Sequence, residues 1–203
     1  MSSRLCGIIT LAMEQIRTFI AVLISPELKS RIGEVEENFK KLPCDVKWVA
    51  EENLHITLKF LGNVSENKLE AVCSAVQKTA AAIPSGFELA MSGVGAFPNI
   101  GRPQVIWVGV HKGGEEMAKL AELLDDALSG LGFEKEKKRF SAHVTIGRAR
   151  SPRGLDSLAE AIRTMQAEDL GSETIESIAV MKSELRPSGP VYSVVGEFKL
   201  GAS

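Results

Sequence analysis

The chain has 203 residues, which is long enough to form a core and fits one domain or two small lobes that share a cleft. Its hydrophobic fraction of 44% and charged fraction of 25% are those of a folded globular protein, which excludes disordered and fibrous classes. The formal net charge of −2 argues against a protein that coats nucleic acid, although it leaves room for a local cationic site that binds one phosphate.

The first residues differ in character from the rest of the chain. The apolar run at 5–12 is too short to span a membrane, and the single Arg4 before it is a poor match to a signal peptide. We predict a disordered or loosely packed extension at 1–12, a single domain over 13–203, and a cytoplasmic protein.

Helices and strands are mixed along that domain. In chain order the pattern predicts a strand at 17–24, a helix at 27–41, strands at 46–49 and 54–61, a helix at 65–82, strands at 87–94 and 104–110, a helix at 115–131, a strand at 140–146, a helix at 155–167, and strands at 174–183 and 192–200. Ser25 and Pro26 suit the N-cap and first position of the first helix, Pro43 ends it, and Ser65 can cap the second. Several connections are short enough for hairpins. The predicted fold class is therefore α+β with mainly antiparallel strand pairing, not a doubly wound parallel sheet.

One motif occurs twice in the predicted strands. Residues 54–58 (LHITL) and 142–146 (AHVTI) both read apolar-His-apolar-Thr-apolar. Because successive side chains of a strand point to opposite faces, the histidine and threonine of each motif project together and the apolar residues pack behind them. At ordinary composition, two such motifs are expected by chance with a frequency of about 10⁻⁴ in a chain of this length. A lone histidine is more often a core residue, but the repetition indicates function.

The paired motifs suit proton transfer at phosphorus. An imidazole titrates near neutral pH, so of His55 and His143 one can take a proton from an attacking water while the other gives a proton to the departing alkoxide. The hydroxyls of Thr57 and Thr145 can donate hydrogen bonds to the non-bridging phosphate oxygens, where negative charge builds up. The alternative for each threonine is an ordinary β-branched strand residue.

Arg148 lies five residues after His143, where the strand is expected to end. Its planar guanidinium can bind a phosphate through two parallel hydrogen bonds. The alternative is an exposed charge at a strand end, as for Arg150.

No metal or cofactor site is predicted. The third histidine, His111, has no partner threonine and is expected at the surface or in a turn. The three cysteines, Cys6, Cys44 and Cys73, form no C-x-x-C pair, and the histidines lack the spacing of metal ligands.

Two further groups of residues have both a binding and a structural interpretation. Trp48 and Phe97 can stack on a terminal base, although core packing is the alternative for each. The basic run of Lys135, Lys137, Lys138 and Arg139 can steer an RNA strand toward the second motif, although solvated charge is the default for such a run.

With both motifs the chain resembles the two-histidine (2H) phosphoesterase superfamily and, within it, the RNA 2′,3′-cyclic phosphodiesterase family, historically called 2′-5′ RNA ligase-like. The likeness covers most of the chain from Arg17 to Leu200. It rests on the segments at 17–22, 46–49, 55–62, 97–98, 103–109, 140–148, 183–185 and 192.

This resemblance implies a bilobal fold, in which two pseudo-symmetric lobes of mainly antiparallel sheet with flanking helices surround a central cleft. It implies hydrolysis of a terminal 2′,3′-cyclic phosphate to a 2′-phosphate, with RNA or nucleotide ends as the partner and no cofactor. By the same resemblance His55 donates the proton to the leaving group and His143 is the base, whereas the residues themselves do not distinguish the two roles.

Two other functions remain open at this point. The same site can ligate or cleave a 2′-5′ linkage, or it can belong to a nucleotide- or RNA-binding module without turnover. The matched histidines argue against the pure binding module, because binding alone does not need two acid–base groups. Nothing in the sequence indicates an obligate protein partner, so we expect a monomer.

Overall fold

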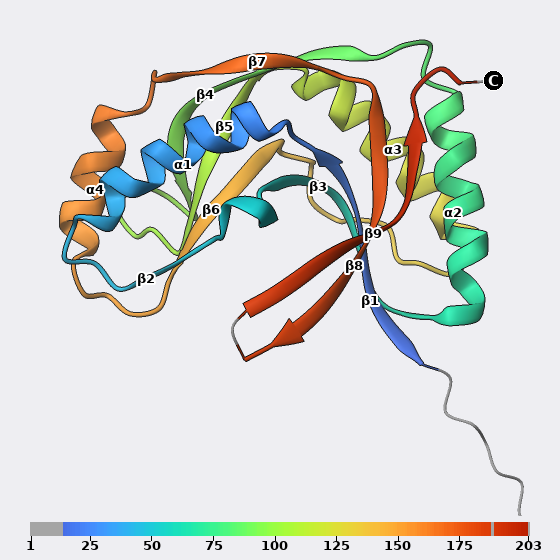
Figure 1. Cartoon of the computed structure of the whole chain (residues 1–203), viewed down its shortest axis with the longest axis horizontal. Coiled ribbons are helices and arrows are strands. Elements are labelled where there is room, and N and C mark those ends of the chain that lie inside the picture. The colour runs from blue at the N-terminus through green and yellow to red at the C-terminus, as the bar shows by residue number, and fades with distance from the viewer. Residues whose placement is uncertain (1–13, 188, 203) are drawn as a thin grey trace, which may run out of the picture.

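The computed structural model describes residues 14–187 and 189–202, so the extension predicted at 1–12 lies outside the described residues. The described chain forms nine strands, four α-helices and one short 3-10 helix (Figure 1). The strands are β1 (Gln15–Leu23), β2 (Val46–Trp48), β3 (His55–Ser65), β4 (Phe87–Phe97), β5 (Val105–Lys112), β6 (His143–Ala149), β7 (Asp169–Ile175), β8 (Ser177–Arg186) and β9 (Gly189–Lys199). The helices are α1 (Pro26–Lys40), η1 (Glu51–Asn53), α2 (Glu66–Ala81), α3 (Gly114–Ser129) and α4 (Leu155–Thr164).

All strand pairs are antiparallel and belong to one curled sheet with the order β7-β4-β5-β6-β3-β1-β8-β9, while β2 pairs with residues 147–149 at the end of β6. The central pair, β3 and β6, is joined in register at a single position, Ile56 opposite Val144. The sheet therefore has two lobes, here called the β3 lobe (β3, β1, β8 and β9) and the β6 lobe (β6, β5, β4, β7 and β2). This arrangement confirms the predicted α+β fold with antiparallel lobes.

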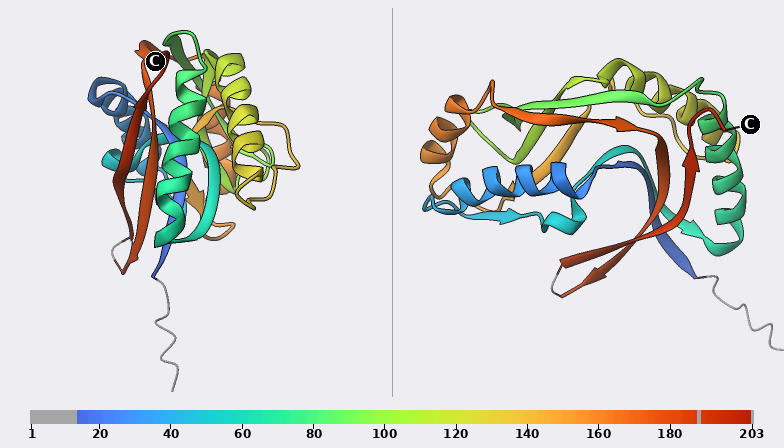
Figure 2. Two further views of the ribbon diagram at one scale, coloured as in Figure 1. Left: turned by 90° about the vertical axis from the view of Figure 1, so that its right-hand side faces the viewer. Right: turned by 45° about the horizontal axis from the view of Figure 1, so that its top comes forward.

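Helices α2 and α3 lie at one end of the molecule and α4 at the other, while α1 runs from beside α4 toward the middle (Figure 1). Helix α1 follows β1 of the β3 lobe but packs on β7, and α3 follows β5 of the β6 lobe but contacts β3. Helices α2 and α3 pack together at one end, and α4 contacts β4 at the other. The right-hand view of Figure 2 shows the same separation of the two ends. Each lobe is thus covered in part by a helix whose preceding strand belongs to the other.

Helix α1 shows how the sequence builds this layer. Ser25 caps it, because its Oγ accepts a hydrogen bond from the backbone N–H of Leu28 at 3.2 Å, and Pro26 takes the first position, as predicted. Leu28, Ile32 and Phe39 recur at helical spacing on one face and are buried in the main core. Ser65 differs from its prediction. It stands at the N-cap of α2, but its hydroxyl donates to Asn67 Oδ1 at 2.6 Å and caps no backbone N–H.

Several predicted strand boundaries differ from the observed ones by a few residues, and one predicted strand is divided in two. The single strand predicted at 174–183 is two strands separated at Glu176, with β7 on the edge of one lobe and β8 next to β1 in the other. Only Leu170 and Ile175 of β7 are buried, so this edge strand has no alternating apolar pattern to reveal it. The strand predicted at 140–146 begins at His143, which is the first of these residues to pair with β5, opposite Gly109.

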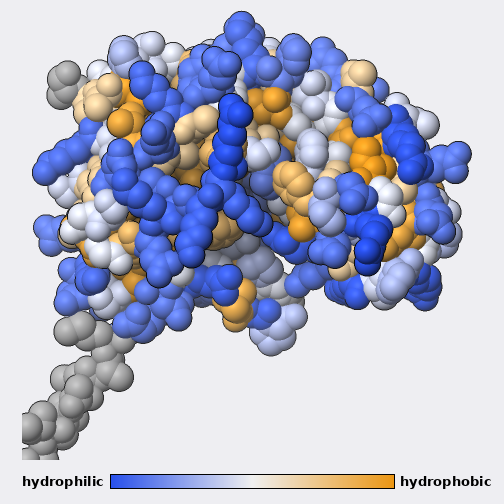
Figure 3. Space-filling model, turned by 180° about the vertical axis from the view of Figure 1, so that it is seen from behind, coloured by the Kyte–Doolittle hydropathy of each residue, from blue (hydrophilic) through white to orange (hydrophobic). Residues whose placement is uncertain are grey.

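Within 14–187 and 189–202, no helix is both long and apolar enough to cross a membrane. Seen from behind, the surface is predominantly hydrophilic and its hydrophobic areas are small and separated (Figure 3).

Candidate functional site

The two His-x-Thr motifs lie against each other at the junction of the lobes. Because Ile56 is opposite Val144 in an antiparallel pair, the register sets His55 across from Thr145 and Thr57 across from His143. Both middle residues are fully buried against the helices. The four polar side chains consequently project from the opposite face of the sheet, here called the open face.

Backbone carbonyls hold both imidazoles in the same way. His55 Nδ1 lies 2.7 Å from the carbonyl oxygen of Asn53, and His143 Nδ1 lies 2.7 Å from that of Ser141. A carbonyl only accepts, so Nδ1 of each ring carries a proton and Nε2 is left to exchange one with a ligand. Thr57 Oγ1 lies 3.0 Å from Nε2 of His55 and can donate to it while that imidazole is neutral.

An aromatic pair flanks each histidine. The rings of Phe19 and Tyr192 have their centroids 4.9 and 5.3 Å from that of His55. On the other lobe the rings of Phe97 and Trp107 lie 5.1 and 6.4 Å from that of His143. These rings restrict each imidazole on its sides and shield it from water.

The same aromatic surroundings set the electrostatics of the site. Burial is the largest cause that lowers the pKa of both His55 and His143 below the ordinary 6.5. The hydrogen bonds to the carbonyls oppose this shift. The positive charge of Arg148 lowers the pKa of His143 further, and the neighbouring Lys29 and His143 do the same to His55. Both imidazoles of the free protein are thus mainly neutral at pH 7.

A β-bulge places Arg148 on the open face. By simple alternation a residue five positions after His143 points to the opposite side. The register with β5 shifts within β6, however, so that Thr145 lies opposite Trp107 and Arg148 lies opposite Val105. Positions 105 and 107 share a face, and Arg148 therefore joins the histidine and threonine that precede it.

The β3 lobe repeats this bulge with a different side chain. The register with β1 also shifts after Thr57, which lies opposite Ala21, so that Phe60 lies opposite Phe19. Phe60 is five residues after His55 and corresponds to Arg148 of the other motif. It is 61% exposed, although it is a large apolar side chain. The two lobes thus offer a cation and an aromatic ring at equivalent positions.

The absence of a side chain at Gly147 allows β2 to pack against the bulged part of β6. A Cβ at this position would lie 2.8 Å from Cε3 of Trp48 and 2.8 Å from Cγ1 of Val46. Trp48 packs here with its ring stacked on that of Phe39, with centroids 6.1 Å apart, and both belong to the main core or its edge. The core role of Trp48 is therefore confirmed, and this ring is turned away from the open face.

The other predicted candidates are distributed as follows. Phe97 lies beside His143, so it is available to a ligand as well as to Trp107, 5.2 Å away. His111 is exposed near the end of β5, two residues after Gly109, which pairs with His143. The predictions missed Phe19 and Tyr192, because β1 is apolar on both faces and β9 carries no motif.

Among the described residues, no group of three or more His, Cys, Asp or Glu side chains is placed to hold a metal ion. Cys44 and Cys73 are free, half-buried thiols. The third cysteine of the sequence, Cys6, lies outside the described residues.

Comparison with known proteins agrees with the doubled site. The profile of the LigT-like phosphoesterases matches the chain twice in succession, at residues 22–107 and 108–192, so that each copy contains one His-x-Thr motif. A protein of Methanothermobacter thermautotrophicus named RNA 2′,3′-cyclic phosphodiesterase is 35% identical over 186 residues, which are 92% of this chain and 100% of that protein. One of the same name from Aquifex aeolicus is 35% identical over 195 residues, covering 93% and 100%.

The fold has solved relatives as well. A crystal structure of a Thermus thermophilus protein superimposes with a TM-score of 0.77 at 27% identity, covering 92% of this chain and 98% of that one. The complex of Escherichia coli LigT with 3′-AMP superimposes with a TM-score of 0.72 at 21% identity, covering 93% and 100%, which shows a common fold.

Proposed function

Because the chain belongs to the LigT-like phosphoesterase family, we propose that it is an RNA 2′,3′-cyclic phosphodiesterase that hydrolyses a terminal 2′,3′-cyclic phosphate to a 2′-phosphate. The observation that carries the proposal is the antiparallel pairing of the two motifs about Ile56 and Val144, with Nδ1 of each ring held by a carbonyl. We infer that the two Nε2 atoms, which come from opposite lobes, face one ligand. Attack and departure on opposite sides of phosphorus need such a pair.

The proton transfers follow from the ring orientations. Water attacks phosphorus as Nε2 of His143 accepts one of its protons, and the bond from phosphorus to the 3′ oxygen breaks as that oxygen takes the Nε2 proton of His55 in its protonated form. Both Nδ1 protons stay on their rings and remain hydrogen-bonded to the carbonyl oxygens of Asn53 and Ser141, which keep the rings aligned throughout. The positive charge of Arg148 lowers the pKa of His143 and so favours its neutral form, which is the form that can accept a proton from water. This agrees with the roles implied by the family resemblance.

We assign the phosphate to three further side chains. The hydroxyls of Thr57 and Thr145, each opposite the other motif's histidine, donate to the non-bridging oxygens. Arg148 reaches the same phosphate from the bulge and balances the charge that develops there.

Incubation with an RNA oligonucleotide that ends in a 2′,3′-cyclic phosphate, in the presence of EDTA, tests the proposal. We expect an RNA with a 2′-phosphate end. Formation of a 3′-phosphate would contradict the assigned leaving group, joined oligonucleotides would indicate a 2′-5′ ligase, and binding without turnover would indicate a binding module.

We also propose that the protein works in the cytoplasm as a monomer. Free thiols at Cys44 and Cys73 suit a reducing compartment, and the site combines both motifs from a single chain. Size-exclusion chromatography with light scattering should give the mass of one chain, and activity independent of protein concentration should accompany it.

A further inference from the structure

A groove of about 930 Å³ runs beside the open face. One wall is the second half of β3, from Phe60 to Ser65, and continues to Lys68 at the start of α2. The other wall is the segment from Gly132 to Lys138, which leads from α3 toward β6. We call this feature the lysine groove.

Phe60 connects the lysine groove to the histidines. It lines the groove, and the bulge in β3 places it on the same face as His55 and Thr57. Its ring lies 6.1 Å from that of Phe19, which in turn lies 4.9 Å from His55. Phe19 is buried, at 3% exposed, so it joins the two rings by packing, and Phe60 is the ring that is open to a base. Exposed aromatic rings of this kind stack on bases of any identity.

The charge of the groove suits a phosphodiester backbone. Lys68, Lys137 and Lys138 line it and form no ion pair within the described ranges 14–187 and 189–202. The other charged side chains that line the groove are Lys135, which is paired with Asp126, and the acidic Glu134 and Glu136. The exposed lysines therefore outnumber the carboxylates in a protein whose net charge is −2.

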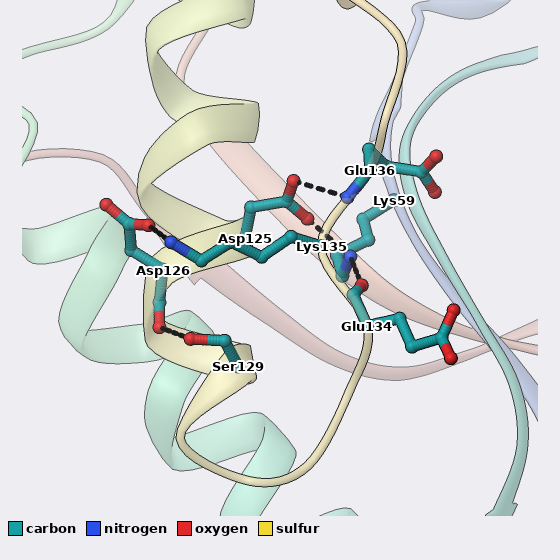
Figure 4. A network of polar contacts seen from close by, with 7 residues as sticks. All are labelled: Lys59, Asp125, Asp126, Ser129, Glu134, Lys135 and Glu136. Carbon is teal, nitrogen blue, oxygen red and sulfur yellow. Dashed lines mark hydrogen bonds and ion pairs between the residues drawn. The ribbon is translucent and has the colours of Figure 1, made fainter.

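The far wall is held in place by a network of charged and polar contacts (Figure 4). Lys59 of β3, only 3% exposed, pairs with Asp125 of α3 and donates to the carbonyl oxygen of Glu134 at 2.8 Å. Asp125 also accepts a hydrogen bond from the backbone N–H of Glu136 at 2.9 Å. Strand, helix and wall are thereby fixed relative to one another, so the groove has its form before a ligand binds.

We propose that the lysine groove binds the RNA strand on the 5′ side of the terminal cyclic phosphate, with Phe60 stacked on the base that enters it and the lysines on the phosphates. The inference rests on the proposed function and narrows its substrate class to RNA strands, in preference to free cyclic nucleotides. The two bulges then have different functions: the bulge of β6 directs Arg148 to the reacting phosphate, and the bulge of β3 directs Phe60 to a base of the RNA strand.

The test compares the double variant K137Q/K138Q with K78Q/K119Q, which removes two exposed lysines outside the groove, on α2 and α3. Fluorescence anisotropy gives the Kd for an RNA oligonucleotide with a 2′-phosphate end. We expect the groove variant to bind about tenfold more weakly than the control, with a salt dependence reduced by about 1.4 in log Kd against log salt, since each lost phosphate contact on a single strand contributes about 0.7. Phe60→Ala should weaken binding about fivefold and Phe60→Tyr should not, as expected for base stacking.

Activity gives the second measurement. The ratio of kcat/KM for the cyclic-phosphate RNA to that for a 2′,3′-cyclic mononucleotide should fall about tenfold in K137Q/K138Q relative to K78Q/K119Q. Equal ratios and equal Kd values in the two double variants would overturn the groove proposal while turnover still supports the phosphodiesterase. Absence of turnover in the unmodified protein would overturn the proposed function instead, and the anisotropy measurement would still decide on the groove.

Discussion

At the scale of single residues, the two imidazoles are held by the same kind of backbone contact. Each ring is held through Nδ1 by the carbonyl two positions earlier in the chain, just before its strand begins, at Asn53 and at Ser141, and offers Nε2 to the open face. Because the anchor is backbone, the tautomer of each ring does not depend on a second side chain. The local sequence therefore prepares each proton-transfer group separately, and the strand pairing only has to bring them together.

We expect His55→Ala and His143→Ala each to lower kcat by about 10² to 10⁴, the usual contribution of one positioned acid or base. The measurement is steady-state hydrolysis of the cyclic-phosphate RNA. The matched control is His111→Ala, because His111 is exposed near the end of β5. Since His55 packs against two aromatic rings, circular dichroism must accompany the assay. A folded variant of either motif with a normal rate would refute the two-histidine mechanism.

The pH dependence follows from the direction of the pKa shifts. The reaction needs one protonated and one neutral imidazole, and burial lowers the pKa of both below 6.5. The profile of kcat/KM, which reports the free enzyme, should therefore be bell-shaped with its maximum on the acid side of pH 6.5. Arg148→Ala removes a cation that lowers the pKa of His143, so the acidic limb should move to higher pH. An unmoved limb, measured alongside Arg150→Ala as control, would show that Arg148 does not act on the base.

At the scale of single elements, the bulges of β3 and β6 decide which side chains reach the site. In both strands the register shifts after the threonine, and the residue five positions past the histidine returns to the open face. Gly147 is part of the bulge of β6, and only a residue without a Cβ at this position leaves room for Trp48 of β2. The closing of β2 over the bulge thus depends on one missing side chain.

Gly147→Ala should lower the free energy of unfolding by about 1–3 kcal/mol, because the added carbon overlaps Trp48 and forces β2 or the bulge to move. Urea denaturation followed by circular dichroism gives this value. Gly130→Ala is the control: Gly130 has a helical φ of −63°, and the nearest atom to an added Cβ is 3.6 Å away. Equal stability of the two variants would show that the strand adjusts without strain.

At the scale of the whole molecule, the lobes are interleaved. Helix α1 crosses from the β3 lobe to pack on β7, and α3 crosses in the other direction to contact β3. The buried pair of Lys59 and Asp125 adds a polar tie between β3 and α3. Neither lobe completes its core from a contiguous stretch of chain, which supports the prediction of a single domain.

This arrangement predicts one cooperative unfolding transition. Trp48 and Trp107 both lie in the β6 lobe, on β2 and β5, so their fluorescence reports on that lobe, whereas far-ultraviolet circular dichroism reports on all elements. The two signals should give coincident urea curves. Separate midpoints would show that the lobes unfold independently and that the single-domain prediction is wrong.

The parts of this protein that its sequence determined are those governed by local spacing. Alternation along a strand is enough to put His55 with Thr57, and His143 with Thr145, on one face each, and their repetition is enough to indicate the chemistry. Ser25 and Pro26 likewise mark the start of α1 from nearest neighbours alone.

The tertiary structure decided what depends on residues distant in sequence. Only the pairing of Ile56 with Val144 brings the motifs together, only the bulges turn Arg148 and Phe60 toward the open face, and only packing between strands adds Phe19 and the remaining aromatic rings. Alternation predicts the opposite face for a residue five positions after a histidine. A register shift is a property of two strands, and no single strand records it.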